Sequence, residues 1–242
     1  MVRLFALLFS ILLFSAYIVL AKFRVEEGKI VCKEVEIQLL KTKEGSFYST
    51  RDFQTLLKRE GINVIGRPTK QINTAKIEQK LNSNEYIERA ICYKTTEGNL
   101  YLSIVQKRPF FKVYSGGKSF YTTEEGGIVS ASRPYNKKML VVSGSPTESF
   151  CKGELFDFVR YIKKDKDLDG NIQEVQVSQE GELTLIPSHG KFKIVFGEIK
   201  DIDSKFEKLA LFYEQGLPQV GLGRYKSIDL TYRGQVVCSK PE

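Results

Sequence analysis

The strongest constraint on this chain is an uncharged run of 18 residues, Leu4 to Ala21, close to its N-terminus. A helix rises about 1.5 Å per residue, so the run would measure roughly 27 Å, close to the hydrocarbon thickness of a bilayer of about 30 Å. We therefore predict a transmembrane helix over residues 4–21, with residues 1–3 as a short cytoplasmic stub. The rest of the chain is predicted to lie on the other side of the membrane.

The alternative is a cleavable signal peptide, because Arg3 precedes the run and Val19-Leu20-Ala21 offers small residues at plausible cleavage positions. The apolar region of a signal peptide is usually only about 7 to 15 residues long. The length of the run therefore favours a retained anchor. Either interpretation places the bulk of the protein outside the cytoplasm.

The composition is that of a folded protein, with 42% hydrophobic and 27% charged residues. The net charge of +8 raises the question of nucleic-acid binding, but acids are interleaved with the bases, as in residues 163–169 (KKDKDLD). We therefore expect no nucleic-acid partner. A solvated surface, or closeness to anionic lipid and wall polymers, explains the charge.

The first module predicted beyond the anchor spans residues 30–107. Its hydrophobic periodicity indicates the order strand, helix, helix, strand, strand. The supporting segments are the alternating run 34–40, a helix capped by Ser49 and Thr50, a helix capped by Asn73, and a hairpin formed by Ala90–Thr95 and Leu100–Val105.

The second module, residues 108–242, is predicted to be a mixed β domain with two helices, so that the whole chain is α+β. Helical periodicity appears over residues 148–163 and from about Asp201 to Gly216. The strands are expected at 110–114, 119–122, 128–129, 140–142, 172–177, 182–186, 192–196, 225–232 and 235–238. In the second helix the predicted buried side chains are Ile202, Phe206, Leu209, Ala210 and Tyr213.

Calcium binding is suggested by Asp165, Asp167, Asp169 and Gly170, which match the first half of a calcium-binding loop. The twelfth position is Gln176 instead of a bidentate Glu, and a strand follows where a helix is required. We therefore predict a polar turn between a helix and a strand, with no metal and no cofactor.

The remaining chemistry is sparse. The only histidine, His189, lies in a predicted turn, and no segment combines a nucleophile or paired carboxylates into a convincing catalytic set. We expect no enzyme activity and no small-molecule substrate. The four cysteines, Cys32, Cys92, Cys151 and Cys238, could form two disulfides in an oxidising compartment or act as small buried side chains. Their spacing leaves both possibilities open.

The order of these features resembles the FtsQ/DivIB family of bacterial cell-division proteins, over nearly the whole chain. The segments that carry the resemblance are Val105–Phe110 (VQKRPF), Phe120–Gly126 (FYTTEEG), Val141–Gly144, Leu183–Pro187, Lys205–Leu209 and Ser227–Tyr232. The chain departs from the family in its minimal cytoplasmic tail, residues 1–3, and in Thr123, where an Asp is common.

The resemblance implies a POTRA-like first domain and a non-enzymatic scaffold of the divisome. Such a scaffold binds FtsB and FtsL and links early division proteins to septal peptidoglycan synthesis. It lies in the inner membrane at the division septum, with its N-terminus cytoplasmic and its bulk periplasmic. The alternatives are a periplasmic POTRA-type chaperone or transport factor and, less consistent with the residues, a wall hydrolase.

The predicted partner-binding site lies in the two terminal strands. Alternation along residues 227–232 places Ile228 and Leu230 inward and Asp229, Thr231 and Arg233 outward. Tyr232 either closes the core or serves as an exposed interface anchor, and the sequence leaves this open. The resemblance points to the same strands as the FtsB-binding site. The predicted residues are Asp229, Thr231, Tyr232, Arg233, Gln235 and Val237.

Overall fold

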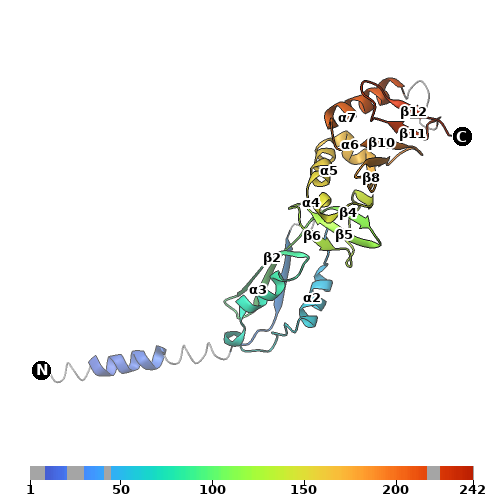
Figure 1. Ribbon diagram of the computed structural model, residues 1–242. Helices are drawn as coiled ribbons and strands as arrows, with labels where there is room; N and C mark the ends of the chain where they lie inside the picture. Colours follow the sequence, from blue (N-terminus) through green and yellow to red (C-terminus); the bar gives the residue numbers. More distant parts are fainter. Residues whose placement is uncertain (1–8, 21–29, 41–44, 217–223, 242) are drawn as a thin grey trace. The chain divides into compact units, whose positions relative to one another are not determined.

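A computed structural model describes residues 9–20, 30–40, 45–216 and 224–241 of the chain (Figure 1). The chain divides into two compact units, Met1–Gln106 and Lys107–Glu242.

The N-terminal part of the first unit contains a helix over residues 9–20 whose side chains are exposed. Among the described residues, no helix has both the length and the apolar character that a membrane span requires. The predicted helix over 4–21 also includes residues 4–8 and 21, which lie outside the described residues, as does the predicted stub 1–3.

The remainder of the first unit has the predicted strand, helix, helix, strand, strand order. The elements are β1 (Val35–Leu40), α2 (Thr50–Arg59), the short 3₁₀ helix η2 (Thr69–Gln71), α3 (Thr74–Asn82), β2 (Ile87–Lys94) and β3 (Leu100–Gln106). The three strands form a sheet in the order β1-β3-β2, in which β1 is parallel to β3 and β2 is antiparallel to it. The two helices bury Phe53, Leu56, Leu57, Ile77 and Leu81.

Local capping explains where the two helices begin. Ser49 and Asp52 form a capping box at α2, and the Asn73 side chain accepts a hydrogen bond from the Lys76 backbone N–H at 2.9 Å at the start of α3. The loop before α2 is hydrogen-bonded to Gln106, the last residue of β3. The buried Gln106 side-chain oxygen accepts from the backbone N–H groups of Phe47 and Tyr48, at 3.0 and 2.8 Å. This buried amide ties the loop to the last strand.

The second unit is built on a sheet that has nine strands within the described residues, in the order β12-β11-β10-β9-β8-β7-β4-β5-β6. Pairing is parallel between β4 and β7, β7 and β8, and β10 and β11. The strands are β4 (Pro109–Ser115), β5 (Lys118–Thr123), β6 (Ile128–Ser130), β7 (Val141–Gly144), β8 (Ile172–Val177), β9 (Leu183–Pro187), β10 (Lys193–Gly197), β11 (Ser227–Asp229) and β12 (Val237–Ser239).

Two helical crossovers join parallel strands of this sheet, as parallel pairing requires. Helices α4 (Glu148–Lys152), α5 (Glu154–Lys164) and α6 (Lys166–Asn171) connect β7 to β8. Helix α7 (Ile202–Leu211), followed by the π-helical turn η3 (Phe212–Gly216), lies between β10 and β11 in the chain. The ring of Phe158 in α5 lies 4.9 Å from Phe196 in β10 and 6.1 Å from Phe206 in α7, measured between centroids. One aromatic cluster therefore holds both crossovers on the sheet.

The structure corrects three details of the second unit. The single helix predicted over 148–163 is two helices, because Gly153 has a non-helical backbone (φ −110°, ψ −113°). The described part of this unit contains four α-helices and not two. Ala210, predicted to be buried in α7, is exposed, whereas Phe206 and Leu209 are buried as predicted.

Gly144 is the residue whose lack of a side chain matters most for the register of this sheet. It ends β7 at φ +98°, and a Cβ placed there would lie 2.1 Å from the Val177 carbonyl oxygen of β8. The same carbonyl accepts a hydrogen bond from the Ser145 backbone N–H at 3.0 Å. Only glycine allows this close approach at a positive φ.

We predict that Gly144→Ala lowers the free energy of unfolding by at least about 1–3 kcal/mol. The variant combines a strained φ with a clash between the new Cβ and the Val177 carbonyl oxygen. Urea denaturation of the full chain measures the effect. Gly170→Ala in α6 is the matched control, since the added Cβ meets open space, and helix propensity gives a change within about 1 kcal/mol. Equal stability of the two variants would contradict the prediction.

Candidate partner-binding edge

The two terminal strands lie at one end of the nine-stranded sheet. Strand β11 pairs in parallel with β10, and β12 pairs antiparallel with β11, with Ser227 opposite Ser239 and Asp229 opposite Val237. Within the described residues, β12 is the last strand on this side. Its outer backbone N–H and C=O groups therefore form an edge that another strand can extend.

Tyr232 lies just beyond the end of β11 and is 49% exposed. The structure thus places its ring at the surface and not in the core. In contrast, Ile228 and Leu230 are fully buried, as the alternation predicts.

Lys208 of α7 fixes the backbone around Tyr232. Its ammonium group donates hydrogen bonds to the carbonyl oxygens of Leu230, at 2.9 Å, and Tyr232, at 2.6 Å. These charge-assisted bonds hold the chain that leaves β11 against the helix. The role of Lys208 could not be predicted from the sequence, because no local pattern links it to carbonyls 22 and 24 residues further along.

In the structure the strand predicted over residues 225–232 ends at Asp229, although the predicted alternation of buried and exposed side chains continues through Leu230 and Thr231. The Asp229 carboxylate accepts from the Thr231 backbone N–H at 2.8 Å and from its hydroxyl at 2.6 Å. β11 covers only residues 227–229, so it begins two residues later and ends three residues earlier than the predicted strand, and the turn at Asp229 marks its end. Asp229 therefore serves first as the acceptor of a local turn.

The other predicted residues lie on the exposed part of the hairpin. Thr231, Arg233 and Gln235 are exposed, and Val237 in β12 is 40% exposed. The turn itself relies on Gly234, at φ +69°. The predicted set is thus brought together around the end of β11 and along β12, with Tyr232 and Val237 as its apolar members.

The residues considered for other chemistry have structural explanations. The Asp165 carboxylate caps α6 by accepting from the backbone N–H groups of Asp167, at 2.8 Å, and Leu168, at 3.2 Å. In the described part of the chain, no group of three or more His, Cys, Asp and Glu side chains is arranged to hold a metal. His189 is exposed in the turn between β9 and β10.

The cysteines are free thiols, with Cys32, Cys92 and Cys151 buried and Cys238 half-buried. Burial raises the pKa of the Cys92 thiol to about 12 and that of Cys151 to about 11. Both side chains are therefore protonated at neutral pH, which disfavours reactivity because the thiolate is the nucleophile.

The fold defines a protein that joins a POTRA-like unit to a larger mixed β unit with an open C-terminal edge. The description "FtsQ/DivIB, C-terminal related" matches residues 108–239, and "POTRA-like domain" matches residues 30–105. The chain belongs to the FtsQ/DivIB family, a family of non-enzymatic cell-division proteins. Comparison with curated protein sequences gave no match.

We predict that Lys208→Met increases amide hydrogen exchange over residues 230–234 and lowers the free energy of unfolding by about 1–3 kcal/mol, because two carbonyls lose a charged donor. Hydrogen-exchange mass spectrometry and urea denaturation measure these effects. Lys226→Met, at an exposed position before β11, is the control. Unchanged exchange in Lys208→Met would show that the hydrogen bonds of Lys208 do not order residues 230–234.

We also predict that chelation leaves the melting temperature of the protein unchanged, since the Asp165 carboxylate caps a helix. The measurement is thermal unfolding in EDTA and in added calcium. A rise of several degrees with calcium would reveal a binding site, because a ligand stabilises the state that it binds.

Proposed function

We propose that this protein is a membrane-anchored, non-enzymatic scaffold of the divisome that binds FtsB and FtsL through the C-terminal edge of its β unit. The observation that carries the proposal is the open edge of β12 beside the exposed Tyr232. A sheet edge of this kind takes up a partner strand through main-chain hydrogen bonds, and neighbouring side chains provide specificity.

Binding would divide between backbone and side chains. A strand of FtsB pairs with β12, and the ring of Tyr232 packs on it as the main apolar contact, since aromatic side chains dominate interface energetics. Val237 adds apolar area on β12, while Arg233 and Gln235 supply polar contacts from the turn. Asp229 and Thr231 shape the backbone from which Tyr232 projects.

The proposed location is the inner membrane at the division septum. The uncharged run over residues 4–21 supports a single anchor with the N-terminus in the cytoplasm and the bulk in the periplasm. In this position the scaffold would link early division proteins to septal peptidoglycan synthesis. A POTRA-type chaperone or transport factor shares the first unit, but the family match over residues 108–239 favours the scaffold.

We predict that Tyr232→Ala weakens binding of the periplasmic segment of FtsB by about 1–3 kcal/mol, because it removes an exposed aromatic ring at the centre of the proposed interface. Isothermal titration of the full chain in detergent measures the affinity. Tyr93→Ala is the matched control, since Tyr93 is 48% exposed but lies in β2 of the other unit.

Circular dichroism establishes that both tyrosine variants remain folded. If folded Tyr232→Ala binds FtsB with the affinity of Tyr93→Ala, the proposed interface is wrong. Loss of binding in both variants would also count against a site confined to the terminal strands.

A further inference from the structure

One end of the POTRA-like unit is built from two segments that are far apart in the sequence. The Gly66 backbone N–H donates to the Cys32 carbonyl at 2.7 Å, and the Cys32 N–H donates to the Arg67 carbonyl at 3.0 Å. The Thr69 N–H donates to the Ile30 carbonyl at 2.9 Å. The loop that follows α2 is thereby held against residues 30–32, which precede β1.

This end of the unit is also the part closest in sequence to the apolar run. Residues 22–29 separate Ala21 from Ile30. Even a fully extended segment of this length reaches only about 30 Å. If the run anchors the chain, the surface around residues 30–32 and 65–70 is confined close to the lipid.

Exposed aliphatic side chains gather around the hydrogen-bonded pair. Ile65 is 68% exposed in the loop, and Ile30 and Val31 are 38% and 37% exposed. Single exposed apolar residues are common at protein surfaces and need no explanation. Here, however, Ile30, Val31 and Ile65 all lie within two residues of the hydrogen bond between Gly66 and Cys32. They form an apolar patch of the kind that marks an interaction surface.

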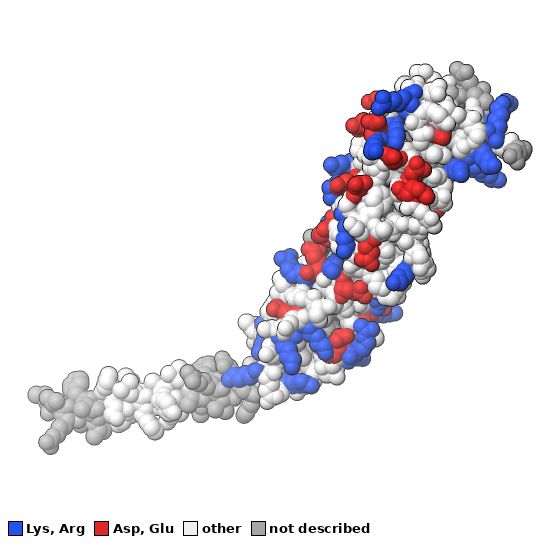
Figure 2. Space-filling view, viewed as in Figure 1, with Lys and Arg blue, Asp and Glu red and all other residues white. Residues whose placement is uncertain are grey.

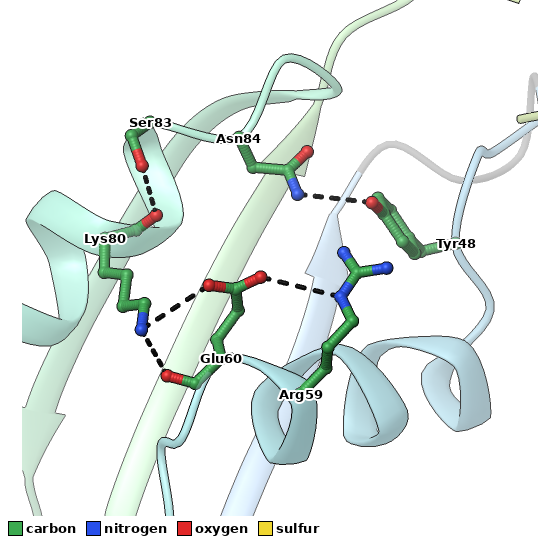
Figure 3. Close-up of polar contacts among 6 residues, drawn as sticks. All are labelled: Tyr48, Arg59, Glu60, Lys80, Ser83 and Asn84. Carbon is green, nitrogen blue, oxygen red and sulfur yellow. Dashed lines mark hydrogen bonds and ion pairs between the residues drawn. The ribbon is translucent and has the colours of Figure 1, made fainter. Parts of the chain in front are cut away.

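Cations surround this patch, and Lys and Arg side chains are visible at this end of the unit (Figure 2). The acid Glu60 is already engaged: its carboxylate lies 3.5 Å from Lys80 Nζ and 3.6 Å from Arg59 Nε, and Lys80 also donates to its backbone carbonyl (Figure 3). Among the residues that the structure describes, Glu34 and Glu97 are exposed acids close in sequence to this surface. Described residues that place an exposed cation here include Lys33, Arg67, Lys70 and Lys76.

A groove of about 480 Å³ between the end of α2 and α3 continues this surface. Ile62, Val64 and Ile77 supply apolar walls, and Arg67 and Lys76 line the same groove. The groove therefore combines cationic groups for a phosphate with apolar area for the parts of a lipid beneath it.

We propose that this surface, formed by Ile30, Val31, Lys33, Ile65, Arg67, Lys70 and Lys76, docks on anionic phospholipid headgroups of the membrane that carries the anchor. The cations are attracted to an anionic leaflet within a Debye length, and Ile65 enters the interface. The short connection to the anchor favours lipid over an acidic protein segment, because it keeps the local concentration of headgroups high. The inference rests on the anchor proposed above.

The test places a probe at Ile65 in the full chain. Ile65→Cys is labelled with an environment-sensitive fluorophore in a Cys238→Ser background, since Cys32, Cys92 and Cys151 are buried. The protein is reconstituted into vesicles of phosphatidylcholine, with or without phosphatidylglycerol, that contain brominated lipid. Both leaflets have the same composition, so the orientation of the protein does not affect the comparison.

We expect several-fold stronger quenching of the fluorophore in the anionic vesicles than in the neutral ones, and loss of that difference in high salt. Arg67→Glu with Lys76→Glu should reduce quenching to the neutral level. The matched control is Arg51→Glu with Arg89→Glu, which reverses two exposed cations near the start of α2 and in β2. This control should leave quenching unchanged.

Equal quenching in the two kinds of vesicle, or no effect of the Arg67 and Lys76 reversals, would overturn the proposal. So would a response of the probe to polyglutamate in the absence of any response to anionic lipid, which would indicate an acidic protein partner. Alkaline extraction of the same vesicles tests the membrane anchor separately from the docking surface. If alkali releases the chain, the anchor is wrong, whereas a retained chain without lipid-dependent quenching contradicts only the docking surface.

Discussion

The candidate partner site depends on the parallel pairing of β11 with β10. Parallel neighbours cannot be joined by a tight turn, so the chain must cross over between them, and α7 lies in that connection. The ring of Phe206 in α7 lies 5.3 Å from Phe196 in β10 and 6.1 Å from Phe158 in α5. This buried aromatic packing positions α7, and through it the start of the terminal hairpin.

The same helix determines how the edge is presented. Lys208 holds the carbonyls of Leu230 and Tyr232, and the Asp229 turn sets the direction in which the chain leaves β11. A partner strand would meet a backbone that is already ordered, which reduces the entropy lost on binding. Edge strands are usually protected against pairing, and the shortness of β12, with three residues, limits how far unselective pairing can extend.

The first unit presents a different kind of surface. Its helices are capped locally, the loop before α2 is tied to β3 through Gln106, and Ile30, Val31 and Ile65 are exposed where residues 30–32 meet the loop after α2. The two proposals therefore use physically distinct surfaces. One depends on main-chain pairing with a protein strand, and the other depends on charge and apolar contact with lipid.

The sequence by itself determined the elements whose pattern is local. The hairpin of β2 and β3, the strand Ile172–Val177 and the inward direction of Ile228 and Leu230 follow from period-two alternation, and the caps at Ser49 and Asn73 follow from side chains next to the helix starts. The tertiary structure alone decided the break at Gly153, the exposure of Tyr232, the early end of β11 and the contact between Lys208 and two distant carbonyls. These depend on how a helix lies across a sheet, and residue spacing carries no information about contacts between segments that the fold brings together.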